Sequence, residues 1–181
     1  MHATISDAIC DTVQNSIEAG ARNISLSVTE DGRMIRVDIR DDGKGMDEAT
    51  RKRAWDPFYT EPGKHDKRRV GLGLPLLRQM AESAGGGVEL ESVKGEGTHL
   101  AYSFAADNLD TPPLGDVAGT VLTLFNWEGS FELAFSHVKG AESYEISRSE
   151  LVDAVGSLQD AQSLALAAQF LRGQEESLSA A

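Results

Sequence analysis

A carboxylate and an amide lie one helical turn apart near the start of the chain. In the stretch DTVQNSIEAGA, Asp11 and Asn15 are four positions apart, so their side chains are stacked on one side of a helix. Ile9, Val13 and Ile17 recur at helical spacing and predict a face that packs on a core. Because burying such a polar pair without partners is costly, the spacing raises the question of what Asp11 and Asn15 face.

Three glycine-rich loops follow, DDGKGM (41–46), VGLGLP (70–75) and KGEGTH (94–99). Each one alone is compatible with a tight turn or with close approach of the backbone to a ligand. VGLGLP is not a full GxGxxG motif and does not lie in a parallel βαβ unit, which disfavours dinucleotide binding. The basic stretch KHDKRR (64–69) is compatible with a solvated surface or with contacts to phosphate oxygens.

The charge distribution excludes one class of partner. The formal net charge is −12, and residues 106–181 alone hold 12 acidic and 3 basic side chains. This argues against a nucleic-acid-binding surface, but not against a local basic pocket for a small anion.

The sequence shows no signal for secretion or membrane insertion. The first residues lack a basic region followed by an apolar stretch, and no run approaches the roughly 18 apolar residues of a membrane span. The single cysteine, Cys10, excludes an internal disulfide and is typical of a reducing compartment. We therefore expect a cytoplasmic protein without a membrane partner.

The order of the patterns predicts a two-layer α/β sandwich. After the first helix, two alternating segments flank an Asp-Gly turn, which indicates an antiparallel hairpin. A loop, two helices separated by a longer loop, and a second strand pair follow. The expected elements are strands at 23–29 and 34–40, helices at 47–55 and 72–85, and strands at 87–92 and 98–105.

Composition changes suggest where the domains end. We expect a first domain at 1–106, a linker at 107–116 that contains two prolines, a small α+β appendage at 117–157, and a C-terminal helix with a frayed tail at 158–181. Within the appendage the expected order is αββα, although VAGTVLTLF (117–125) by itself is compatible with a helix or a strand.

Taken together, the motifs resemble the GHKL superfamily of ATP-binding domains, which includes gyrase, heat-shock chaperones, sensor histidine kinases and the MutL mismatch-repair ATPases. The motifs that carry the resemblance are Asp11-xxx-Asn15, Asp41-x-Gly43-x-Gly45, Asp56-Pro57-Phe58, Gly71-x-Gly73 and Gly97-Thr98. The first helix is similar to the MutL type and the later motifs to histidine kinases. The resemblance covers residues from about 5 to 105 and implies the Bergerat fold.

The resemblance implies roles for four polar residues. Asn15 would hold Mg2+ through its amide oxygen, and Asp11 would orient the attacking water as the catalytic base. The related ATPases have glutamate at this position, so the shorter Asp11 implies slow hydrolysis. Asp41 would accept a hydrogen bond from the adenine amino group, with assistance from Thr98.

The remaining implied contacts with ATP come from glycines, apolar side chains and basic side chains. Gly43 and Gly45 would let the backbone lie close to the base. The loop 60–70 would be the ATP lid, whose basic residues neutralise the triphosphate before a helix N-terminus that binds phosphate. The other implied contacts are Met46, Phe58, Lys67, Arg68, Arg69, Gly71, Leu72, Gly73 and Leu74.

Three functional interpretations follow. Only ten residues precede Asp11, and none of the four histidines is followed in a helix by an acid and a proline, so a phosphoryl acceptor is expected on a partner protein. The first interpretation is a stand-alone histidine kinase-like kinase or ATPase. The second is a non-catalytic ATP-dependent switch or an anti-sigma-type serine kinase that regulates a partner by binding. The third is an α/β domain without a nucleotide site.

Overall fold

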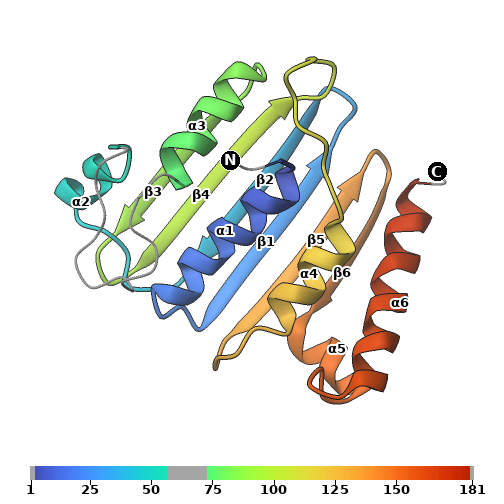
Figure 1. The fold of residues 1–181 in the computed structure, drawn as a ribbon. Coiled ribbons are helices and arrows are strands. Elements are labelled where there is room, and N and C mark those ends of the chain that lie inside the picture. Colours follow the sequence, from blue (N-terminus) through green and yellow to red (C-terminus); the bar gives the residue numbers. More distant parts are fainter. Residues whose placement is uncertain (1–2, 57–72, 180–181) are drawn as a thin grey trace.

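In a computed structural model that describes residues 3–56 and 73–179, the chain forms a six-stranded sheet with helices on one face (Figure 1). The strands lie in the order β3-β4-β2-β1-β5-β6. The elements are α1 (Ile5–Glu18), β1 (Asn23–Glu30), β2 (Met34–Asp41), α2 (Glu48–Arg53), α3 (Gly73–Ser83), β3 (Gly87–Val93), β4 (Gly97–Ala105), α4 (Val117–Phe125), β5 (Glu132–Lys139), β6 (Glu142–Ser147), α5 (Arg148–Val155) and α6 (Ala161–Ser179).

The two predicted strand pairs of the first hundred residues are confirmed. β1 and β2 pair antiparallel, and so do β3 and β4. In the turn between β1 and β2 the Asp31 carboxylate accepts hydrogen bonds from the backbone N–H groups of Arg33 and Met34, and Gly32 has a φ of +82°. This local chemistry explains why the Asp-Gly signal placed the hairpin correctly.

The predicted two-layer arrangement is also confirmed. In β1, Ile24, Leu26 and Val28 are buried under the helices, whereas the alternate side chains such as Ser25 are more exposed. α1, α3, α4 and α6 lie on the same side of the sheet (Figure 1). One face of the sheet therefore carries the core, as the period-two alternation requires.

The predicted linker, 107–116, contributes to the start of α1. Its backbone carbonyl oxygens at Pro113 and Leu114 accept hydrogen bonds from the N–H groups of Ile5 and Ser6. Thr4 caps the same helix end through a capping box with Asp7. The N-terminal donors of α1 thus find partners both in their own turn and in a segment about a hundred residues later in the chain.

The segment expected as an α+β appendage contributes two strands to the same sheet. β5 pairs parallel with β1, and β6 pairs antiparallel with β5. The stretch at 117–125, ambiguous in the sequence, is the helix α4, which begins at an Asp116 side chain that accepts from the Gly119 N–H group. Phe125 and Phe135 belong to the same buried cluster as Ile9 of α1. The domain boundaries themselves stay a prediction.

The C-terminal helix is longer than the sequence predicts. We expect a frayed end after a helical middle, but α6 continues to Ser179. Ala167, Leu171 and Leu178 on this helix are buried, and they recur at helical spacing on the side that faces the sheet. Packing therefore extends the helix beyond the point that local propensity indicates. Among the described residues, no helix combines the length and the apolarity that crossing a membrane requires.

If α6 is held by its buried face, truncating Leu171 destabilises the protein. Leu171 is 0% exposed, so Leu171→Ala should lower the free energy of unfolding by about 2–5 kcal/mol because it leaves a cavity. The matched control is Leu166→Ala on the same helix, where the side chain is 48% exposed and the expected change is within about 0.5 kcal/mol. Urea unfolding of both variants measures the difference. Equal losses would show that α6 does not depend on this packing.

Candidate functional site

The end of β2 brings together residues that are far apart in the sequence. Asp41, the last residue of β2, pairs with Thr98 of β4 in the sheet register. From α1, the Ser16 hydroxyl donates a 2.6 Å hydrogen bond to Asp41 Oδ2. The backbone N–H of Gly43 donates to Asp41 Oδ1 at 2.9 Å. The half-buried Asp41 carboxylate is therefore held by one hydrogen bond on each oxygen.

The neighbouring carboxylate, Asp42, hydrogen-bonds to the segment that follows α1 instead of to α1 itself. It accepts hydrogen bonds from the backbone N–H and the side-chain amide of Asn23, and from the backbone N–H of Arg22. These donors, with those of Asn23 first, hold the pKa of Asp42 below its ordinary value. Asp42 thus fixes the loop after α1 to the end of β2, while Asp41 is the carboxylate that faces α1 and β4.

Two glycines next to Asp41 occupy positions where a side chain does not fit. Gly45 has a φ of +57°, and a Cβ there would overlap the carbonyl oxygen of Val93. Gly97 has a φ of +121°, and a Cβ there would overlap the carbonyl oxygen of Asp41. Because these backbones approach so closely, no side chain fits at either position, and bare backbone lies beside Asp41 in the loop and in β4.

Ser92 of β3 makes three polar contacts beside these glycines. Its buried hydroxyl accepts from the Met46 backbone N–H at 2.8 Å and donates to the Gly97 carbonyl oxygen at 3.0 Å. The Thr98 hydroxyl lies 2.9 Å from Ser92 Oγ. Since a serine hydroxyl has one proton, Thr98 is the donor in this contact and keeps its oxygen lone pairs for another partner. Met46 and Thr98 are thus positioned by the same side chain.

The predicted Mg2+ ligand and base lie on α1, the helix that also carries Ser16. Asp11 is half-buried and Asn15 is exposed. In the part of the chain that the structure describes, no group of three histidine, cysteine or acidic side chains could hold a metal ion by itself. An amide oxygen as the single side-chain ligand fits Mg2+, because this ion keeps several waters and takes phosphate oxygens as further ligands.

The predicted phosphate-binding segment is described only in part. Gly73 is the first residue of α3, and a Cβ there would meet no atom within 4 Å. Leu74 is half-buried and packs against the core. The other predicted residues of this segment, Phe58, Lys67, Arg68, Arg69, Gly71 and Leu72, lie outside the described residues.

Sequence reasoning missed two residues that hold the site in place. Ser16 had a detectable signal, because Thr12 and Ser16 are polar residues four apart on the buried face of an otherwise apolar helix. Ser92 had none, since one serine in an alternating strand is unremarkable until β3 is seen beside the loop that contains Met46.

Comparisons with known proteins identify the family to which this sequence is similar. The sequence model of the family described as "Histidine kinase-, DNA gyrase B-, and HSP90-like ATPase" matches residues 3–108. The sensor histidine kinase WalK of Bacillus subtilis is 26% identical over 106 residues, which are 55% of this chain and 17% of WalK. The sensor histidine kinase YxdK of the same organism is 31% identical over 101 residues, 54% of this chain and 31% of YxdK. The chain thus spans less than a third of these relatives.

A solved structure extends the likeness of the fold beyond residue 108. The crystal structure of the N-terminal domain of a DNA repair protein superposes with a TM-score of 0.58 over 87% of this chain and 58% of that chain, at 13% sequence identity. At this identity the likeness concerns the fold alone.

The contact between Ser16 and Asp41 predicts a loss of nucleotide affinity. Ser16→Ala removes a hydrogen bond to a carboxylate, which allows Asp41 to rotate, and we expect ATP to bind about 3- to 30-fold more weakly. Ser25→Ala on the exposed face of β1 is the matched control and should leave the affinity unchanged. Calorimetric titration of each variant with Mg-ATP measures the effect. Wild-type affinity in Ser16→Ala would contradict a positioning role.

Proposed function

The chain belongs to the family of histidine kinase-, DNA gyrase B- and HSP90-like ATPases, and from this membership we propose that it transfers the γ-phosphoryl group of ATP to a partner protein or to water. The coarser part, a GHKL ATP-binding module, follows from the family. The kinase or ATPase activity of this chain and the roles of its residues are our proposal.

The observation that carries the proposal is the fixed carboxylate of Asp41 beside bare backbone. Adenine presents an amino group as a donor, and a carboxylate held at 2.6 and 2.9 Å by Ser16 and Gly43 is a positioned acceptor for it. Guanine presents a carbonyl oxygen at the corresponding place, which the carboxylate repels. Asp41 therefore recognises adenine by charge and direction, and Thr98 adds a second polar contact.

Two residues of α1 would act at the phosphate end. Bound Mg2+ neutralises phosphate charge, and Asn15 would hold this ion through its amide oxygen. Asp11, one turn earlier, would orient the attacking hydroxyl or water and take up its proton. The side chain of Asp11 is one methylene shorter than the glutamate of related ATPases, which favours slow turnover.

The curated relatives favour histidine kinase-like chemistry. WalK and YxdK are named sensor histidine kinases. We therefore propose a histidine kinase-like reaction that phosphorylates a partner protein.

A second candidate is an ATP-dependent switch, or an anti-sigma-type serine kinase, that regulates its partner by binding. The observation that favours the switch is again Asp11, because a misplaced base lowers turnover but does not affect ATP binding. The two candidates make different predictions for the fate of the γ-phosphate.

Nucleotide binding is tested by removing the charge of Asp41. We expect calorimetry to show Mg-dependent ATP binding by the wild type and a loss of about 10- to 150-fold in Asp41→Asn, since an amide presents an N–H group where adenine also presents one. Asp42→Asn, a matched change at the next residue, should bind ATP as the wild type does. No heat with the wild type at saturating Mg-ATP would overturn both candidates.

Turnover is tested with ATP labelled at the γ-phosphate. If Asp11 orients the nucleophile, Asp11→Ala should bind ATP normally but release or transfer label about 100-fold more slowly. Glu18→Ala, an exposed carboxylate on the same helix, is the matched control. Label on a candidate partner would support the kinase, free phosphate the ATPase, and intact bound ATP the switch. Unchanged turnover in Asp11→Ala would exclude this residue as the base.

A further inference from the structure

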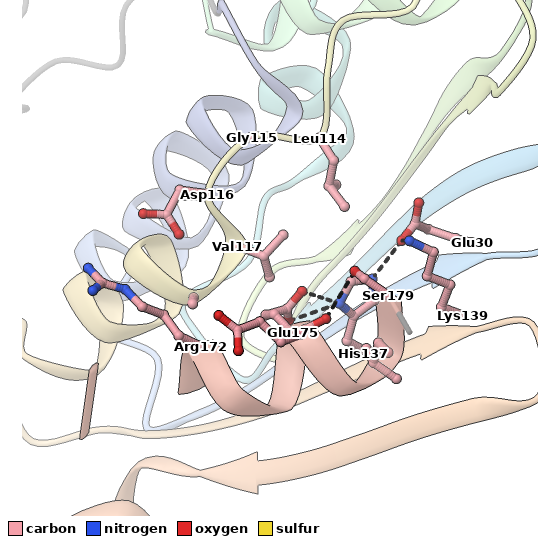
Figure 2. A pocket seen from close by; sticks show the side chains of 13 residues that line it. Glu30, Leu114, Gly115, Asp116, Val117, His137, Lys139, Arg172, Glu175 and Ser179 are labelled. Carbon is pink, nitrogen blue, oxygen red and sulfur yellow. Dashed lines mark hydrogen bonds and ion pairs between the residues drawn. The ribbon is translucent and has the colours of Figure 1, made fainter. Parts of the chain in front are cut away.

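A cavity lies at the opposite end of the sheet from Asp41. It has a volume of about 410 Å³ and is formed by the ends of β1 and β5, the start of α4 and the last turns of α6 (Figure 2). The register separates the two places, because Asp41 pairs with Ile24 at the start of β1, whereas Glu30 on the cavity wall is the last residue of β1. A volume of this size accepts a small organic molecule.

A buried histidine connects the cavity wall to α6. His137 of β5 is 1% exposed, and its Nδ1 lies 3.0 and 3.1 Å from the two carboxylate oxygens of Glu175 (Figure 2). The Tyr144 hydroxyl donates to the same carboxylate at 2.5 Å. Burial, and then the nearby Glu175, raise the pKa of Tyr144, so this phenol keeps its proton and remains a donor. Glu175 is therefore held in one orientation.

The other nitrogen of His137 is not satisfied in this way. Nε2 is buried and has no hydrogen-bond partner among the described residues. Glu30 Oε1 lies 3.3 Å away as an ion-pair partner, but no hydrogen bond joins the two atoms. Nε2 and the Glu30 carboxylate thus lie side by side at the cavity wall without a hydrogen bond between them. A buried polar atom without a partner is rare and costly, and here a donor would satisfy both groups.

The composition of the wall indicates the charge of that donor. Four carboxylates line the cavity, from Glu30, Asp116, Glu175 and Glu176, against two cationic side chains, from Lys139 and Arg172. Lys139 forms an ion pair with Glu30 at 3.7 Å, a distance too long for a hydrogen bond, so the carboxylate can still accept a hydrogen bond from a ligand. An anion would meet an excess of negative charge, whereas a cation would not.

The remaining wall is apolar. Leu114, Val117, Ala118 and Leu178 line the cavity together with these polar groups, so a ligand that fills it needs a carbon body as well as a charge. A bare divalent ion is poorly matched, since no metal-binding group of three side chains occurs in the described ranges.

We propose that this cavity binds a small organic ammonium compound. Its N–H groups donate to the Glu30 carboxylate and, once the flexible Glu30 side chain moves aside, to Nε2 of His137. Its carbon body packs against Val117 and Leu178. Because the ligand contacts β1, α4 and α6 together, binding holds α6 more firmly on the sheet. The proposal is independent of the nucleotide site, since it shares no residue with it.

The test compares three probes of the same shape. Benzylamine carries the ammonium group, benzyl alcohol is its neutral analogue and benzoate its anionic one. In NMR titrations up to about 10 mM, within reach of the weak affinity of a small fragment, benzylamine should give saturable amide shifts at Glu30, Val117, His137 and Ser179 but not at Asp41 or Thr98. Benzyl alcohol or benzoate binding as tightly as benzylamine, no saturable shift, or shifts located elsewhere would overturn the proposal.

Three variants locate the charge recognition. Glu30→Gln should weaken benzylamine binding about tenfold or more, as expected for a lost charged hydrogen bond, and Glu176→Gln on the exposed rim should weaken it by a smaller factor. Glu145→Gln, an exposed carboxylate of β6 outside the cavity, should bind as the wild type does. If Glu30→Gln does not fold, Glu176→Gln decides. Undiminished affinity in the folded cavity variants would overturn the proposal.

Discussion

A carboxylate at the end of a strand, held by one helix hydroxyl and one backbone N–H, is the contact on which the candidate site depends. Asp41 is useful as an acceptor only if its two oxygens keep one direction, and Ser16 and Gly43 fix that direction from opposite sides. The packing of α1 on the sheet therefore positions three residues of the candidate site. Ser16 lies on the buried face of this helix, and Asp11 and Asn15 lie elsewhere on its surface. A Cβ at Gly43 would meet Asp41 Oδ1, so only glycine at this position leaves the carboxylate uncrowded.

The two ends of the sheet use buried polar groups differently. At the end with Asp41, the side chains of Ser16, Ser92 and Thr98 each have a hydrogen-bond partner, which fixes their positions. At the other end, His137 satisfies one ring nitrogen through Glu175 and leaves the second without a hydrogen bond among the described residues. A fully hydrogen-bonded network keeps its side chains in fixed positions, which suits the recognition of one kind of base. A buried nitrogen without a hydrogen bond, beside a cavity, suits a ligand that supplies the missing partner.

Much of the fold could be predicted because its signals are local. The Asp-Gly turn and the alternation in β1 to β4 each depend on residues a few positions apart. The two later strands were predicted, but not the parallel pairing of β5 with β1, since period-two alternation does not encode which edge a strand joins. The end of α6 was missed because tertiary packing of Leu178 and the hydrogen bonds of Glu175, not propensity, extend the helix.

The sequence by itself determined the family, because the spacing of the motifs within one helix and three loops involves residues that are close together in the chain. The roles of Asp41 and its glycines remain the prediction made from that spacing. Only the tertiary structure decided that Ser16 and Ser92 orient the site, that Asp42 binds Asn23 instead of facing α1, and that His137 meets Glu30 and Glu175 across a cavity. Most of these contacts join residues from 19 to 107 positions apart. Burial of the shared core brings together residues that are far apart in the sequence. The order of residues along the chain does not show which distant polar groups will meet in this way.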